Sequence, residues 1–452
     1  MQLLLVGLAG AVEPGQVQVG GHAAANARLG LGCELLVTPG DCGWLDFHDA
    51  AVAGGWVEAR LGSSGKARLA LDVRAHGPTA ASSLEDSGRP SVVQNSSLKL
   101  QDAYVQARAG WFEASLGAQR LRWGSADGLN PVDVVNAYDL EDPTRFDRRL
   151  ATPMLRMAAT RGLAQLELAV APWFQPALMP TDVVDVLGDS QSRLDLIEAD
   201  GVEIGSLESR VELPQDRIAD VGVGARFFWG TRAGDLALSA FHGRDSLPQV
   251  GGELRITGYQ TNAGRVDMGV PIVYPRLDQL GAEWRRDLFW DVVAWGEVAV
   301  IKPERVEVQF SQAQLESLER LGTIDEVPNP VPSEVTQDGQ VYARWMLGMD
   351  RSFGQVYLNL QWLHGFPTER RRDELRDYGM LALRWSLRPT VALDLRAVSD
   401  GRGVLAGGDL TFLHADSIEW RVGGLYVTGP EGSALGAFRG VSHVGTGAKV
   451  VF

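Results

Sequence analysis

The stretch Lys66–His76, KARLALDVRAH, alternates apolar and polar side chains along most of its length. Its apolar face carries Ala67, Leu69, Leu71, Val73 and Ala75, and its polar face carries Arg68, Asp72, Arg74 and His76. Successive side chains of a β-strand point to opposite faces. The pattern therefore predicts a strand with one apolar and one charged surface.

The same alternation recurs along the 452-residue chain, for example in Gly354–His364 and Gly379–Arg388, and short turns join many of these segments in pairs. The chain also holds 53 glycines, well above the usual share of about 7%. We therefore expect an all-β protein. Strands are predicted at 16–31, 54–61, 66–76, 98–109, 111–122, 152–160, 163–171, 221–229, 234–242, 277–286, 290–301, 341–352, 355–364, 378–388, 390–398, 404–413, 417–427 and 443–452.

The polar faces of these strands decide between a soluble sandwich and a membrane barrel. They carry Arg, Asp, Glu and Gln on almost every strand, and a dry sandwich core could not hold so many charges. A wide barrel can, because its interior is wet while lipid covers its apolar face. The sequence predicts a transmembrane antiparallel up-and-down β-barrel of about 18 strands, with 16 as the alternative. Short periplasmic turns and long extracellular loops should connect the strands.

Several other classes are excluded. No apolar run reaches the roughly 18 residues of a membrane-spanning helix; the longest is Leu3–Val12. A pI near 5.0 argues against nucleic acid as a partner. Motifs for nucleophilic catalysis, phosphate binding, zinc or thiol redox chemistry are absent from the sequence, so we expect no enzymatic activity, no metal and no cofactor.

The two ends of the chain indicate export and barrel assembly. Residues 1–11 are interpreted as a truncated signal peptide and residues 12–452 as a single outer-membrane barrel domain. The alternative for residues 1–11 is no signal at all, because the segment is short and lacks a positive start. Phe452 ends an alternating segment, as a terminal aromatic does in barrels recognised for outer-membrane assembly. Cys33 and Cys42 flank a turn-forming segment and are a candidate disulfide in an oxidising compartment.

The stretch Leu100–Val135 resembles a known family. It contains Asp102-Ala103-Tyr104-Val105, then Leu116-Gly117-Ala118-Gln119-Arg120, then Trp123-Gly124, then Asp127-Gly128-Leu129-Asn130-Pro131-Val132-Asp133-Val134. This is similar to porin-like outer-membrane proteins of Gram-negative bacteria, including barrels distantly related to the alginate-export porin. The resemblance implies a channel or export barrel, and it carries no individual site residue over to this chain.

Alternation assigns a charged set to the lumen, where charged rings tune ion selectivity in pores. The alternative is a network of ion pairs that only stiffens the wall. The candidate pore-lining residues are Arg68, Asp72, Arg74, Arg108, Glu167, Arg226, Glu283, Arg285, Asp291, Glu297, Arg344, Arg384, Asp394, Arg396, Glu419 and Arg421.

The net charge of −15 is concentrated in two segments, 181–220 with eleven acids and three Arg, and 303–340 with eight acids and two Arg. They are interpreted as solvated extracellular loops; the alternative is that they attract or bind cations. Ser311–Gly322 has the caps and leucine spacing of a short helix. Such a helix could plug the lumen, lie over the rim or dock another protein.

These observations predict an integral protein of the bacterial outer membrane, in contact with lipid and lipopolysaccharide. The leading hypothesis is a porin that allows passive or weakly selective diffusion of small polar solutes or ions. The alternative is a scaffold barrel in a multiprotein outer-membrane complex, because the long extracellular loops offer room for protein partners. A transporter of hydrophobic substrates would need an apolar lumen patch or an amino-terminal plug, and neither is evident.

Overall fold

The computed structural model describes most of the chain. The described residues are 17–30, 51–75, 96–126, 128–140, 147–178, 203–214, 220–260, 265–320, 326–327, 329–331, 333–414, 417–430, 433–436, 438 and 442–452. Residues 1–11, Cys33 and Cys42 lie outside them, so the predicted signal peptide and disulfide stay predictions.

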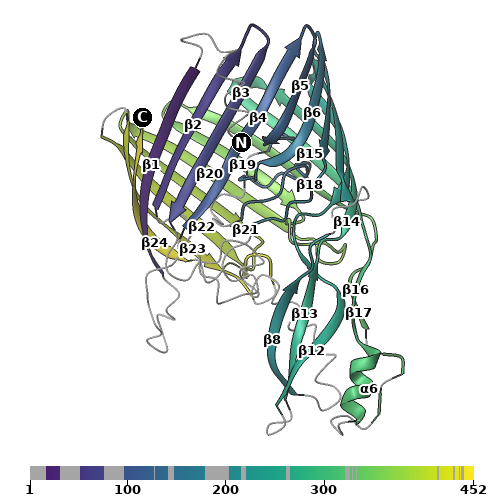
Figure 1. The fold of residues 1–452 in the computed structure, drawn as a ribbon. Helices are drawn as coiled ribbons and strands as arrows, with labels where there is room; N and C mark the ends of the chain where they lie inside the picture. The colour runs from purple at the N-terminus through teal and green to yellow at the C-terminus, as the bar shows by residue number, and fades with distance from the viewer. Residues whose placement is uncertain are drawn as a thin grey trace.

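The described chain forms a closed antiparallel barrel of 18 strands (Figure 1), which confirms the predicted fold class and strand number. Every predicted segment coincides with one barrel strand. The strands are β1 (Val17–Gly30), β2 (Ala51–Leu61), β3 (Gly65–Ala75), β4 (Ser96–Ala109), β5 (Phe112–Gln119), β6 (Thr152–Arg161), β7 (Ala164–Ala171), β9 (Gly222–Thr231), β10 (Gly234–Arg244), β14 (Arg276–Asp287), β15 (Val292–Pro303), β18 (Tyr342–Phe353), β19 (Val356–His364), β20 (Asp377–Arg388), β21 (Val391–Ser399), β22 (Val404–Leu413), β23 (Ile418–Thr428) and β24 (His443–Val451).

Pairing of the first and last strands closes the barrel. β1 pairs with β2 through Val17–Ala25 and with β24 through His22–Gly30. Gly21 and the terminal Phe452 exchange two backbone hydrogen bonds, of 2.7 and 2.9 Å. The end of the chain is thus part of the closing seam.

Connections alternate in length around the barrel, as predicted. Turns of two to four residues join β2 to β3, β4 to β5 and the following hairpins at one end, and most of the longer segments leave from the other. Gly110 and Gly354 sit in such turns with φ of 60° and 61°. A Cβ at either position would meet nothing within 4 Å, so the backbone conformation, not space, favours glycine there.

The outer face of the barrel is apolar. Outward positions carry Leu238, Leu280, Leu347, Leu360 and Val422, each more than two-fifths exposed to the surroundings. Exposed aromatic side chains gather toward the short-turn end, at Trp111, Trp229, Trp290, Trp385 and Trp420. An apolar band edged by aromatic residues is the surface that a lipid bilayer covers. The protein is therefore integral to the outer membrane. No described helix is long and apolar enough to cross a membrane.

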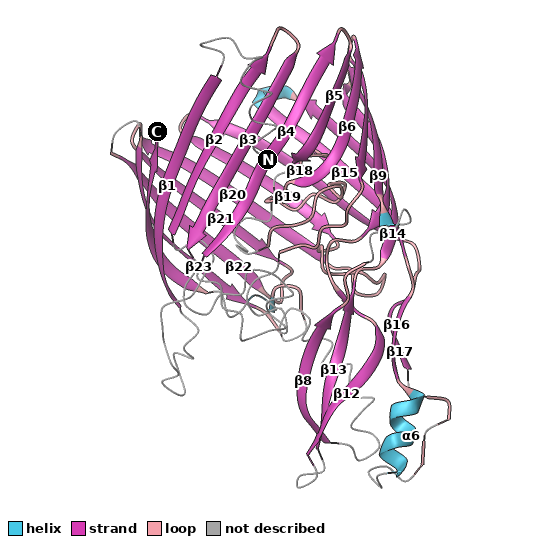
Figure 2. Ribbon diagram, viewed as in Figure 1, coloured by secondary structure: helices cyan, strands magenta, loops and turns pink. Residues whose placement is uncertain are grey.

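A second, six-stranded sheet projects from the long-loop end (Figures 1 and 2). Its elements are β8 (Glu203–Val211), β11 (Gln249–Val250), β12 (Gly252–Gln260), β13 (Arg265–Val273), β16 (Val306–Phe310) and β17 (Ser333–Gln337), with helix α6 (Gln312–Arg320) beside them. The sequence predicts loops for these segments. Their strands are hard to recognise because β11, β16 and β17 are short and because β8 pairs in parallel with β13, which is distant in the chain.

Helix α6 confirms the predicted helix near 311–322. Leu315 is buried in a cluster with Leu254 and Met268 of the second sheet, and the Gln314 side chain accepts a hydrogen bond from the Ile256 backbone (3.1 Å). The helix therefore packs against the second sheet and does not plug the lumen.

The membrane-facing assignment can be tested at Leu347, halfway along β18 and 55% exposed on the outer face. Leu347→Arg should lower the free energy of unfolding by about 2–4 kcal/mol, because the charge enters hydrocarbon. Urea unfolding in lipid vesicles measures this. In the matched control Thr411→Arg the same charge faces a polar cavity inside the barrel and should cost much less. Equal losses would contradict the assignment of faces.

Candidate functional site

The described residues between β5 and β6, which are 120–126, 128–140 and 147–151, fold into the barrel, and we call them the inner loop. Trp123, Leu129 and Val132 are at most 1% exposed. Trp123 and Val132 share a hydrophobic cluster with inward side chains of β7, β10, β15 and β18. Leu129 belongs to a second hydrophobic cluster, which includes Leu405 of β22 and Leu425 of β23. The inner loop is therefore part of buried clusters that reach the barrel wall on both sides of the lumen.

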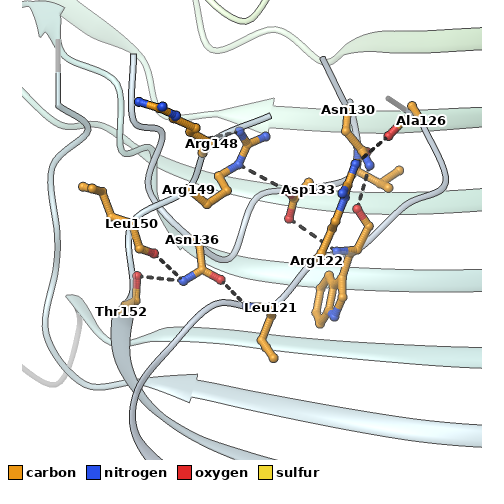
Figure 3. A network of polar contacts seen from close by, with 12 residues as sticks. Leu121, Arg122, Ala126, Asn130, Asp133, Asn136, Arg148, Arg149, Leu150 and Thr152 are labelled. Atoms are coloured by element: carbon orange, nitrogen blue, oxygen red, sulfur yellow. Dashed lines mark hydrogen bonds and ion pairs between the residues drawn. The ribbon is translucent and has the colours of Figure 1, made fainter. Parts of the chain in front are cut away.

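Asn136 joins the two ends of the inner loop (Figure 3). Its Oδ1 accepts a hydrogen bond from the Leu121 backbone (2.8 Å). Its Nδ2 donates to the Leu150 carbonyl (2.9 Å) and to Thr152 Oγ1 (3.1 Å). Asn136 is 1% exposed. Its polar atoms are shielded from water, and these hydrogen bonds satisfy them instead.

An ion pair stiffens the middle of the inner loop. Arg149 Nε lies 3.2 Å from Asp133 Oδ2, and both side chains are 5% exposed. The Arg149 guanidinium also stacks on the Tyr138 ring, 3.8 Å from its centroid. Burial raises the pKa of Asp133, and the charge of Arg149 opposes that rise. The pair thus compensates two charges that would be costly to bury alone.

Wall residues tether the inner loop from three directions. Lys99 of β4 pairs with Asp139 at 2.5 Å. Glu297 of β15 accepts a hydrogen bond from the Ala126 backbone (2.7 Å). Trp123 Nε1 donates to Glu167 of β7 (2.6 Å). Loop and wall form one connected polar framework.

Beside the inner loop, described residues of the lumen line cavities that include the following three. The seam cavity, of about 420 Å³, lies along β20–β24 and β1. The loop cavity, of about 570 Å³, lies between β1–β4 and the inner loop. The wall cavity, of about 300 Å³, is bounded by β4–β7, β9 and the start of the inner loop. The loop cavity shares lining residues with each of the other two, so the three cavities adjoin one another. We call them together the passage.

Charged side chains of both signs line the passage. The basic ones are Arg68, Arg120, Arg122, Arg148, Arg149, Arg156, Arg226, Arg384, Arg396, Arg421 and Lys449. The acidic ones are Asp72, Asp102, Asp133, Asp139, Asp147, Glu167, Asp394, Asp409 and Glu419. Among the described lining residues basic groups are in slight excess, although the chain as a whole is strongly acidic.

Many of these charges are paired on the wall. Arg156 bridges Glu113 and Glu167 at 2.6 and 2.7 Å, and Arg226 pairs with Glu283 at 2.7 Å. On the opposite wall Arg421 pairs with Glu419 at 2.9 Å. Such pairs weaken the field that a passing ion meets, while they hold the side chains in fixed positions.

The structure distributes the sequence-predicted residues over several environments. Nine of them line the passage: Arg68, Asp72, Glu167, Arg226, Arg384, Asp394, Arg396, Glu419 and Arg421. Glu283, Glu297 and Arg344 are buried in the wall; Arg344 donates to the Glu369 and Pro367 carbonyls of the β19–β20 connection.

The remaining predicted residues lie away from the passage. Arg108 and Arg285 are exposed near the short-turn end of their strands. Asp291 lies in the turn Phe289–Asp291 and not on a wall strand, because β15 starts only at Val292. The Arg74 side chain is outside the described residues.

Sequence reasoning missed two groups of lining residues. Arg120, Arg122, Arg148 and Arg149 come from the inner loop, where no periodicity marks the direction of a side chain. Wall residues His22, Trp56, Asp102, Asp409 and Lys449 also line the passage. The alternation of their strands could have revealed them, since Lys449 faces opposite to Ala448 and Val450.

No family model matches this chain, and no curated protein matches it. Among solved structures, OccAB1 of Acinetobacter baumannii is similar over 98% of this chain and 97% of its own, with 9% identity and a TM-score of 0.49. OccD3 (OpdP) of Pseudomonas aeruginosa is similar over 98% of this chain and 92% of its own, with 8% identity and a TM-score of 0.47. The anion-selective porin from Comamonas acidovorans covers 96% and 99%, with 14% identity and a TM-score of 0.41. These similarities give no specific support to the alginate-export resemblance.

The framework of the inner loop can be tested at Asn136. Asn136→Ala should cost about 1–3 kcal/mol, because it leaves buried backbone groups without partners. It should also make the folded barrel cleavable by trypsin after Arg148 or Arg149, where the wild type resists. Gln165→Ala, which removes an exposed amide bonded to Thr160, is the control. Unchanged resistance in Asn136→Ala would show that this side chain does not hold the loop.

Proposed function

We propose that this protein is an outer-membrane porin, through which small polar solutes diffuse passively or with weak selectivity. The proposal is supported by the row of adjoining cavities beside the inner loop, which are lined by Arg and carboxylate side chains. Such a lining favours water and polar solutes over apolar ones, because apolar groups do not compensate the hydration lost by charges. The same lining disfavours a transporter of hydrophobic substrates.

The charge balance of the passage supports weak selectivity with a preference for anions. Most lining charges have an opposite partner, but basic groups slightly outnumber acidic ones. The acidic excess of the chain lies instead in 181–220 and 303–340. Charge on the walls of the cavities lies closer to a passing ion, and is screened less, than charge on the exposed segments outside the barrel.

A scaffold barrel is the second candidate function. The second sheet with α6, which projects from the long-loop end (Figure 1), favours it because it offers surface for a protein partner. We prefer the channel, since a scaffold needs no row of charge-lined cavities in its interior. We also propose a channel and not an enzyme. We expect lipid and lipopolysaccharide to surround the barrel.

Single-channel recording in planar lipid bilayers tests this proposal. The wild-type protein should give stable conductance steps, and its reversal potential in a KCl gradient should indicate a modest chloride preference. Glu419→Gln should increase that preference and Arg421→Gln should decrease it, because each removes one partner of the same ion pair. A folded barrel without conductance would contradict the porin and favour the scaffold.

A further inference from the structure

The seam cavity and the loop cavity meet at four residues. His22, Asp72, Arg148 and Lys449 are the side chains that line both cavities. His22 and Lys449 stand on β1 and β24, the two strands that close the barrel, and Asp72 stands on β3. Arg148 comes from the inner loop. The two cavities therefore adjoin where the wall faces the inner loop.

A glycine brings two of the wall residues together. His22, Gly54 and Asp72 occupy one cross-strand row on β1, β2 and β3. A Cβ at Gly54 would lie 2.2 Å from Asp72 Oδ1 and 2.4 Å from His22 Cε1. Because Gly54 has no side chain, His22 Nε2 and Asp72 Oδ1 approach to 3.7 Å across β2. Gln101 Nε2 fixes the other Asp72 oxygen at 2.7 Å.

Lys449 extends this wall across the closing seam. It faces the lumen on β24, opposite Ala24 of β1 and Glu419 of β23 in the strand register. Its ammonium group carries a full positive charge at neutral pH. The wall side of the junction therefore presents a lysine, a histidine and one carboxylate to the passage.

Arg148 lies on the inner loop, across from this wall, and hydrogen bonds hold its backbone in place. Its carbonyl accepts hydrogen bonds from Arg149 Nη1 (3.1 Å) and from the Asp139 backbone (3.2 Å). Arg149 is locked to Asp133, and Asp139 to Lys99 (Figure 3 shows the Arg149 pair). The inner loop thus holds a second permanent positive charge at the junction.

We propose that His22, Asp72, Arg148 and Lys449 are the specificity-determining residues of the channel, and we call them the seam gate. The gate presents two permanent positive charges and one carboxylate at the boundary between two cavities. It favours small solutes that carry a negative group over cations of the same size. This inference rests on the proposed porin function and assigns the largest share of its selectivity to one point on the passage.

Charge reversal at the gate tests the inference. In bilayer recordings of the full-length protein, Lys449→Glu and Arg148→Glu should each lower the permeability ratio of chloride to potassium severalfold, to below one. Asp72→Asn should raise the ratio. Arg148→Gln and Lys449→Gln, which remove charge without reversing it, should give intermediate ratios. Urea unfolding verifies that each variant is folded.

Arg232→Glu and Arg388→Glu are the matched controls. Both residues are exposed at the short-turn end and outside the lining of the passage, so the ratio should stay at its wild-type value. Gly54→Ala tests the geometry, because its methyl group must push His22 and Asp72 into the passage and reduce conductance.

Three results would overturn the inference. Equal shifts in the control and gate variants would mean that selectivity is spread along the whole barrel. A conducting, anion-preferring wild type with unchanged gate variants would leave the porin function intact and place selectivity elsewhere. A silent wild type would remove the porin function and the gate together.

Discussion

Backbone hydrogen bonding in the bilayer is the constraint on which this structure depends. A lipid-exposed strand edge would leave a row of N–H and C=O groups without partners. The sheet therefore closes through β1 and β24, and Phe452 takes part in the closure. Closure with an even number of strands places the start of β1 and the end of β24 on the short-turn side. It also fixes which side chains face lipid and which face the lumen.

The wet lumen can hold charged side chains that a dry core could not hold. Arg226 and Glu283, or Arg156 and Glu167, can sit on the inner wall because they pair and because water is near. The inner loop uses the same chemistry. Asn136 ties its ends and Arg149 pairs with Asp133. The passage is thus formed jointly by a periodic wall and an aperiodic loop.

The wall was predictable and the loop was not. Period-two alternation located all eighteen barrel strands and placed residues such as Arg384, Asp394 and Arg421 on the lumen face. It was wrong for Asp291, because the turn after β14 extends to that residue. Arg148 and β8 carry no comparable signal. Their positions depend on tertiary contacts and on a parallel pairing between segments distant in sequence. The alternation of their strands predicts the lumen-facing positions of His22 and Lys449. Trp56 is missed when only charged side chains are sought on the lumen face.

The alternation along β23 is the most direct test of the central claim, which is a water-filled passage inside a lipid-facing barrel. Single cysteines would replace residues 419–423 in turn, with Cys33 and Cys42 changed to serine. A membrane-impermeant thiol reagent would then be added to protein in lipid vesicles. The structure predicts labelling at positions 419, 421 and 423, and protection at 420 and 422. Uniform labelling, or protection of positions 419 and 421, would contradict it.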